Sequence, residues 1–200
     1  MKGSRLITFI VPLAVLLCSV PGEGAADADA AGEGVAPAYT PDGALQVPAA
    51  YREWIYLSSG LDMSYSPLAM GMQSVFDNVF VNPESWTAFK KTGHWPDKTV
   101  FVLEIRRATS HGSINKHGSF QTAEVTGLEF HVRDEARFKG GWGFFESDGK
   151  QAARHLAETE SCYECHRKNG AVDTTFVQFY PTAKPIAVAA GTYHEAAEPK

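Results

Sequence analysis

The chain has 200 residues, of which 44% are hydrophobic, and a formal net charge of −5. This length is enough for one domain with its own hydrophobic core, and the negative charge argues against nucleic acid as a partner. Beyond the N-terminal segment, no apolar run is long enough to span a membrane.

The N-terminus predicts a secretory signal peptide. Two basic residues precede an apolar run from residue 6 to residue 20, which is short for a membrane span, and small residues follow it as a cleavage site. We expect residues 1–26 to be removed together with Cys18, and the mature protein to be periplasmic. Leu17 stands where a lipoprotein would need a small residue before that cysteine, which disfavours a lipid anchor.

The rest of the chain divides into a linker, one domain and a tail. Residues 27–40 are rich in Ala, Gly, Asp and Glu and have almost no large apolar side chain, so they predict a flexible linker. Residues 41–194 form a domain without an internal repeat, and residues 195–200 a frayed tail.

Strand patterns dominate the first part of the domain. Trp54 to Leu57 and Val75 to Val81 are rich in β-branched and aromatic residues, as strands are. Residues 99–107 alternate so that one apolar face looks inward. A glycine-containing loop at residues 111–119 then predicts a long hairpin, whose return strand covers residues 120–132.

Short helices are expected between these strands. Asn82 can cap a helix that Pro83 begins and a glycine ends, and residues 151–158 have the composition of a second helix. Residues 140–145 and 174–180 resemble further strands. The pattern predicts an α+β domain, built mainly on an antiparallel β-sheet with short helices packed against it.

The most informative segment is residues 162–166, which read Cys-Tyr-Glu-Cys-His. This is the C-x-x-C-H pattern that attaches a c-type haem, because two thiols one helical turn apart can bond the haem vinyl groups while the next imidazole reaches the iron. We expect Cys162 and Cys165 to hold one haem c covalently and His166 to be the proximal iron ligand. A zinc site would have to recruit further histidines, and a redox disulfide gives no reason for the histidine that follows.

The sixth ligand, on the far side of the iron from the histidine, decides whether such a haem is an electron carrier or a reactive centre. Three methionines would remain after removal of the signal peptide, and all precede the motif: Met63, Met70 and Met72. Packing as apolar side chains is the favoured explanation for them. Among six histidines outside the motif, only His131 lies on a predicted strand, where it shares a face with Glu129. Periodicity alone does not separate a functional face from a row of solvated side chains.

Five segments together resemble the cytochrome P460 family, which includes the cytochromes c′-beta. They are Val81-Asn82-Pro83-Glu84-Ser85-Trp86, Lys90-Lys91-Thr92-Gly93, Gly127-Leu128-Glu129, Trp142-Gly143-Phe144-Phe145 and, after the haem motif, Phe176-Val177-Gln178-Phe179-Tyr180-Pro181. The family's members are periplasmic, usually dimeric, mostly antiparallel-sheet proteins with one five-coordinate c-type haem. The resemblance implies a homodimer in which His166 is the sole axial protein ligand.

The resemblance gives conflicting indications about activity. The named enzymes of the family oxidise hydroxylamine to nitrous oxide, using a distal glutamate that matches Glu129 and a lysine cross-linked to the haem edge. An alignment without gaps places Leu103 at the lysine position, and Asp77 where those enzymes carry a distal arginine. Lys98 falls on the opposite strand face and would need a strand bulge to replace the lysine.

Leu103 and Phe101 therefore predict an apolar distal pocket, like that of the gas-binding cytochromes c′-beta, in which Glu129 would be the proton relay. We expect the protein to bind or detoxify nitric oxide or related small nitrogen oxides, with a soluble redox partner as an option. Hydroxylamine oxidation is the first alternative. Electron transfer with a methionine or histidine as sixth ligand is the second.

Overall fold

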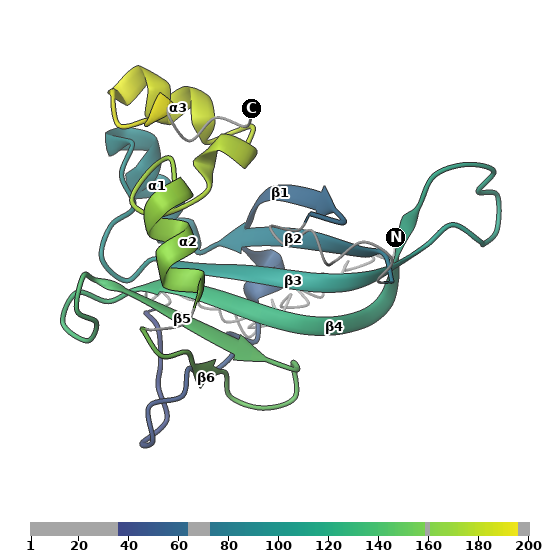
Figure 1. Cartoon of the computed structure of the whole chain (residues 1–200), viewed down its shortest axis with the longest axis horizontal. Helices are drawn as coiled ribbons and strands as arrows, with labels where there is room; N and C mark the ends of the chain where they lie inside the picture. Colours follow the sequence, from purple (N-terminus) through teal and green to yellow (C-terminus); the bar gives the residue numbers. More distant parts are fainter. Residues whose placement is uncertain (1–35, 64–72, 159–160, 196–200) are drawn as a thin grey trace, which may run out of the picture. The chain divides into compact units, whose positions relative to one another are not determined.

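The structure, a computed structural model, describes residues 36–63, 73–158 and 161–195. These residues lie in a compact unit from Gly34 to Lys200 that contains a six-stranded antiparallel sheet (Figure 1). The strands follow one another across the sheet in chain order. They are β1 Ile55–Leu61, β2 Val75–Val81, β3 Val100–Thr109, β4 Phe120–Arg133, β5 Trp142–Ser147 and β6 Arg154–His155.

Three short α-helices accompany this sheet within the described residues: α1 Pro83–Thr92, α2 Ser161–Asn169 and α3 Lys184–Ala190. In Figure 1, α2 crosses in front of the sheet, whereas α1 and α3 lie together beside its end. An antiparallel sheet with helices kept apart from it is the α+β arrangement, so the predicted fold class is confirmed.

Both faces of the sheet carry a hydrophobic core, because successive residues of a strand point to opposite faces. The first core packs β-sheet residues against α1 and α3, and includes Leu57, Val81, Phe89, Phe101, Trp142 and Ala187. The second packs the opposite face against the segment before β1, and includes Leu45, Trp54, Val102, Phe130, Val132 and Phe145. The haem motif lies on the side of the first core.

The prediction that only one face of residues 99–107 looks inward was incomplete. Glu104, on the second face, is only 2% exposed, and Tyr51, Arg52 and Arg106 all donate hydrogen bonds to its carboxylate. Burial alone would raise the pKa of Glu104, but these hydrogen bonds outweigh it and hold the pKa below its usual value. A buried charge is tolerated here because it is fully paired.

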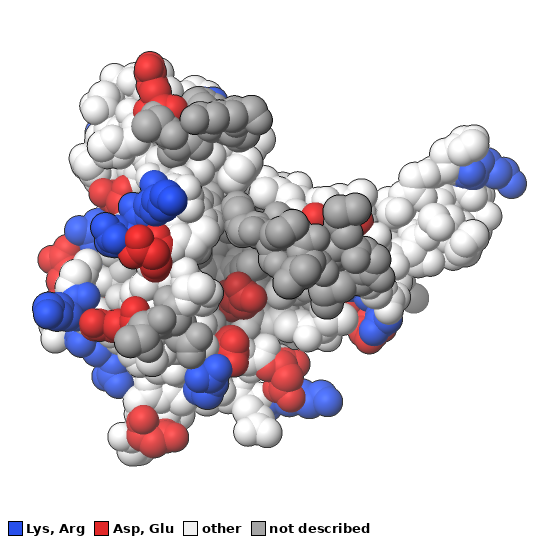
Figure 2. Space-filling model, in the orientation of Figure 1, with Lys and Arg blue, Asp and Glu red and all other residues white. Residues whose placement is uncertain are grey.

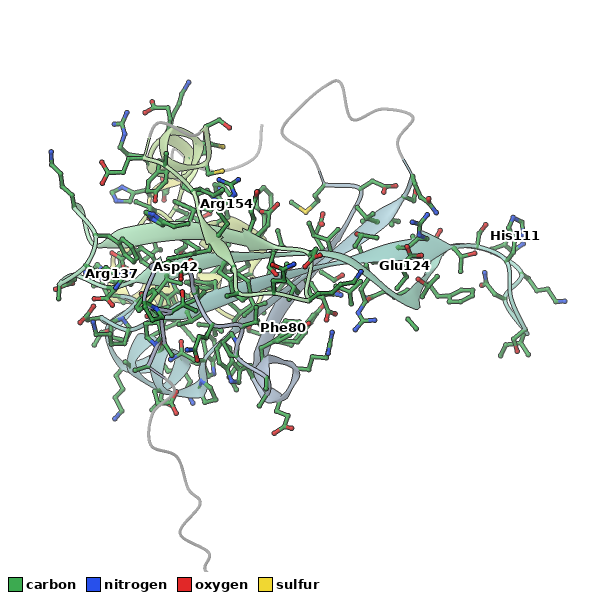
Figure 3. All side chains as sticks on the ribbon, turned by 90° about the horizontal axis from the view of Figure 1, so that it is seen from below. Asp42, Phe80, His111, Glu124, Arg137 and Arg154 are labelled. Carbon is green, nitrogen blue, oxygen red and sulfur yellow. The ribbon has the colours of Figure 1, made fainter. Side chains whose placement is uncertain are left out.

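The predicted long hairpin is confirmed. Strands β3 and β4 continue past the rest of the sheet and end in a loop that projects from it (Figures 1 and 3), with His111 near the tip. Asn115 closes the loop by donating from Nδ2 to the carbonyls of Ser110 (2.8 Å) and Gly118 (3.1 Å).

Two predicted elements were wrong. Residues 151–158 do not form a helix: β6 pairs with β5, and Ala153 exchanges two backbone hydrogen bonds with Leu45. Residues 174–180 do not form a strand, since residues 172–175 form a tight turn and Val177–Phe179 is a short 3-10 helix. In both cases contacts with distant segments outweigh the local composition.

Candidate functional site

Helix α2 carries the haem motif. Cys162 and Cys165 are three residues apart on it, about one helical turn, and neither is joined in a disulfide. Glu164 in the first turn and basic residues in the last turn suit the helix dipole. The thiols are one helical turn apart as the sequence predicted, whereas the separate helix expected at residues 151–158 does not form.

His166 follows directly, and its ring is fixed from several sides. Its Nδ1 lies 2.9 Å from the carbonyl oxygen of Thr174, and the ring packs against Phe176 (4.2 Å between centroids) and Phe144 (4.6 Å). Burial lowers the pKa of His166 to about 4, against the opposing effect of the Thr174 hydrogen bond. The imidazole is therefore neutral at pH 7, donates from Nδ1, and has Nε2 as the lone-pair donor that a metal requires.

The Thr174 carbonyl belongs to a tight turn after α2. Asp173 and Thr174 both have positive φ, 45° and 62°, and Thr175 N–H donates to Val172 O at 2.7 Å. Gly170 allows α2 to approach this turn, because a Cβ there would lie 2.6 Å from the Thr174 carbonyl carbon.

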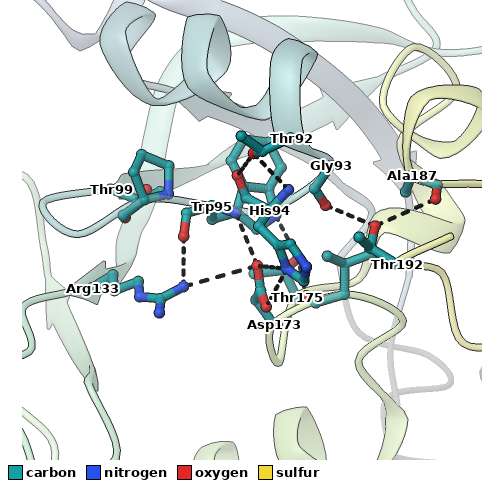
Figure 4. A network of polar contacts seen from close by, with 12 residues as sticks. Thr92, Gly93, His94, Trp95, Thr99, Arg133, Asp173, Thr175, Ala187 and Thr192 are labelled. Atoms are coloured by element: carbon teal, nitrogen blue, oxygen red, sulfur yellow. Dashed lines mark hydrogen bonds and ion pairs between the residues drawn. The ribbon is translucent and has the colours of Figure 1, made fainter. Parts of the chain in front are cut away.

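A network of polar contacts holds this turn (Figure 4). Oxygens of the Asp173 carboxylate lie 3.0 Å from Nδ1 of His94 and accept the Trp95 backbone N–H at 2.8 Å. Arg133 Nη1 stands 3.8 Å from the same carboxylate and donates to the Trp95 carbonyl at 2.5 Å. The Trp95 indole also donates to Thr175 Oγ1 at 2.9 Å. The loop before β3 and the end of β4 are thus both anchored to the turn that contacts His166.

The sheet brings two of the predicted pocket residues together. Leu103 on β3 pairs directly with Glu129 on β4, and in the adjacent row Phe101 pairs with His131. Leu103 is half-buried, whereas Phe101 is 4% exposed and belongs to the first core. The distal roles of Leu103, Phe101 and Glu129 stay predictions.

A hollow of about 480 Å³ opens beside the Leu103–Glu129 row. Acidic side chains lie on this face of the sheet (Figure 2). The lining residues include Ile105, Gly127, Glu129, Glu146, Asp148 and Arg154.

Two carboxyl groups on this face, those of Asp77 and Glu129, have raised pKa values. Burial raises the pKa of Asp77 to about 6, with the charges of Glu129 and Asp62 adding to it. Burial, followed by the charge of Glu146, also raises the pKa of Glu129. Glu129 is open to the hollow, yet the surrounding protein removes part of its hydration, which explains the shift. Both groups can take up and release protons closer to neutral pH than ordinary carboxyls.

His131 proves to be part of the site. It is 7% exposed and stacks on Phe144 (4.1 Å between centroids), while its ring lies 4.8 Å from that of His166. Its Nε2 is buried without a hydrogen-bond partner. Burial, together with the proximity of His166, lowers the pKa of His131 well below its usual value. The strand pattern singled out this residue, but its burial depends on the later packing of α2.

The methionines contribute little to the described site. Met63 is 41% exposed, and its side chain lies over Gly60 of β1. Met70 and Met72 lie outside the described residues. Within residues 36–63, 73–158 and 161–195, no group of three or more His, Cys, Asp or Glu side chains could hold a metal ion by itself.

These residues fit an iron porphyrin better than a bare metal ion. His166 offers one oriented nitrogen donor, the two thiols lie one helical turn apart, and the buried Nε2 of His131 lacks a partner. A single axial imidazole is the ligand set of many reactive haems.

Comparison with protein families decides the identity: the cytochrome P460 family model matches residues 48–177. The chain belongs to the cytochrome P460 family. The matched region runs from before β1 through the haem motif to the turn that holds His166. As a family member the chain is a haem cytochrome, with iron as its metal. A comparison with curated proteins gave no match, and none of the described helices is long and apolar enough to cross a membrane.

Proposed function

We propose that this cytochrome P460 family member holds one haem c on Cys162 and Cys165, with His166 as the only axial protein ligand, and binds or detoxifies nitric oxide or a related small nitrogen oxide. When bound, the haem supplies the iron to which such a ligand attaches. The observation that carries the proposal is the orientation of His166, whose Nδ1 is engaged by Thr174 so that Nε2 remains as donor.

The side chain at position 103 favours gas binding over hydroxylamine oxidation. In the alignment without gaps Leu103 falls at the position of the cross-linking lysine, and an aliphatic side chain makes no such bond. Two observations argue against a replacement by Lys98. Its Nζ lies 2.5 Å from Asp134, and the irregularities in the pairing of β3 with β4 occur beyond Ile105, after Leu103 rather than before it. An aliphatic side chain at this position suits a small uncharged ligand, although carboxyl groups line the hollow beside it.

Nitric oxide titration of the reduced protein, compared between wild type and Glu129→Gln, tests this function. The variant keeps the shape of Glu129 and removes its ionisable proton. We expect the wild type to bind nitric oxide and the variant to bind it with similar affinity, because an uncharged diatomic needs no proton. Failure of the reduced wild type to bind nitric oxide would contradict the proposal.

Hydroxylamine oxidation is the second candidate, favoured by the raised pKa values of Asp77 and Glu129. Carboxyl groups whose pKa is raised toward neutral pH suit a reaction that moves protons. This candidate predicts that the wild type consumes hydroxylamine with an electron acceptor, and that Glu129→Gln loses about 10²-fold in rate. Mass spectrometry of tryptic haem peptides should then find a lysine-containing peptide bonded to the haem. Absence of both turnover and that peptide excludes it.

We also propose that the protein is secreted to the periplasm, where c-type haem attachment takes place. The basic residues and apolar run within residues 1–26 support this. N-terminal sequencing of the purified protein should find a start near residue 27. A mature protein that still begins at Met1 would contradict secretion by cleavage.

A further inference from the structure

The turn that contacts His166 has an unusual backbone. Asp173 and Thr174 both adopt positive φ, a region that two-residue turns usually fill with Gly, Asn or Asp. Thr174 is β-branched, and such residues rarely adopt this conformation. Its Oγ1 is in addition buried without a hydrogen-bond partner, which is a further cost. Strain of this kind persists only where the surrounding structure enforces it.

The enforcing contacts converge on one carboxylate. Asp173 accepts the Trp95 backbone N–H, contacts the His94 ring and faces the Arg133 guanidinium, as Figure 4 shows. Its side chain is only 19% exposed. These partners come from the loop before β3 and from the end of β4, so they fix the turn relative to the sheet.

The strained turn determines the position of the Thr174 carbonyl oxygen. The Thr174 carbonyl oxygen lies 2.9 Å from Nδ1 of His166, and the backbone N–H of Gly170 donates to His166 O at 2.9 Å. A hydrogen bond from the remote nitrogen of a metal-bound histidine makes the imidazole a stronger donor and fixes its plane. The position of this carbonyl therefore controls how strongly His166 donates to iron.

We propose that Asp173 is a positioning residue for the axial histidine: its carboxylate holds the strained turn so that the Thr174 carbonyl stays aligned with His166 Nδ1–H. In this role Asp173 acts through the backbone of the turn. The inference rests on the proposed function only in that His166 ligates the iron. It adds a residue that sets the reduction potential and the strength of the iron–histidine bond.

Resonance Raman spectra of the ferrous haem protein, together with its reduction potential, test this role in Asp173→Asn and Asp173→Ala. The asparagine keeps an acceptor for Trp95 N–H but loses the charge that faces His94 and Arg133, whereas the alanine loses every contact. We expect the iron–histidine stretching frequency to fall and the reduction potential to rise, both more in the alanine variant, because a weaker donor stabilises ferric iron less.

Asp97→Asn is the matched control. Asp97 lies in the same loop before β3, but its carboxylate accepts the Glu135 backbone N–H at 2.9 Å and pairs with Lys98. This variant should keep the wild-type frequency and potential. If both Asp173 variants lose thermal stability yet retain the wild-type frequency and potential, Asp173 is only structural and the inference is overturned.

The two proposals fail in different ways. A wild-type protein without an iron–histidine band would contradict the five-coordinate site itself. The reduction potentials of the Asp173 variants, compared with Asp97→Asn, would still decide whether this carboxylate tunes the iron.

Discussion

Gly170 is the residue that lets α2 meet the turn beneath it. An added Cβ would lie 2.6 Å from the carbonyl carbon of Thr174 and 2.7 Å from His166 O. Both are backbone atoms, which cannot move aside as the end of a flexible side chain could. We expect Gly170→Ala to lower the free energy of unfolding by about 2 kcal/mol and to weaken the His166–Thr174 hydrogen bond. Urea denaturation measures the first effect and the iron–histidine frequency the second.

Gly127→Ala is the control for that substitution, since its new methyl group would meet only Ile105 Cδ1, at an ordinary 3.5 Å. It should change stability much less. Equal stability of the wild type and Gly170→Ala would show that the turn does not require this close approach.

Asp77 gives a pH-dependent prediction. The pKa of this carboxyl is about 6 in the folded protein and about 3.9 in an unfolded chain, so the folded state binds the proton more tightly. Stability due to this group is therefore lost as pH rises from about 4 to about 6. Asp77→Asn should stabilise the protein by about 1 kcal/mol at pH 7.5, after allowance for partial exposure, and have little effect at pH 3.5.

Urea denaturation at the two pH values measures this difference. Asp148→Asn, at an exposed carboxylate near the hollow, should give no comparable gain at pH 7.5. The same change in stability for Asp77→Asn at both pH values would contradict the assigned burial.

At the scale of elements, Asn82 connects α1 to β3. It is 3% exposed, and its Oδ1 accepts the backbone N–H of Val100 at 2.9 Å instead of capping α1. We expect Asn82→Ala to cost about 2 kcal/mol, because the buried Val100 N–H loses its acceptor. Asn115→Ala, in the exposed hairpin loop, should cost far less in the same thermal or urea denaturation. Similar losses in both variants would contradict this explanation.

The elements that could be predicted from the sequence are those with local signals. Pro83 and Gly93 bound α1 as expected, because proline suits a helix start and Gly93 takes the left-handed C-cap conformation, φ 71°. The strand 75–81 and the hairpin loop were also correct. Residues 151–158 were assigned wrongly because β6 owes its conformation to β5 and to Leu45, and such pairing leaves no local pattern.

The candidate site also contains some residues that the sequence could indicate and others that it could not. The haem motif is encoded in five consecutive residues, so Cys162, Cys165 and His166 could be predicted as the haem site without a structure. The Thr174 carbonyl could not, because a backbone acceptor carries no side-chain signal and threonine gives no hint of positive φ. His131 was an ambiguous strand residue until the packing of α2 buried it.

At the scale of the whole molecule, α2 presents one imidazole and the sheet carries Leu103 and Glu129 on one face. We propose that this arrangement holds a covalently attached haem with one open axial side. The absorption spectrum of the purified ferrous protein, made in a host that matures c-type cytochromes, tests it most directly. We predict a coloured protein with a high-spin, five-coordinate spectrum that shifts on addition of nitric oxide. A colourless protein, or a low-spin six-coordinate spectrum that nitric oxide leaves unchanged, would contradict it.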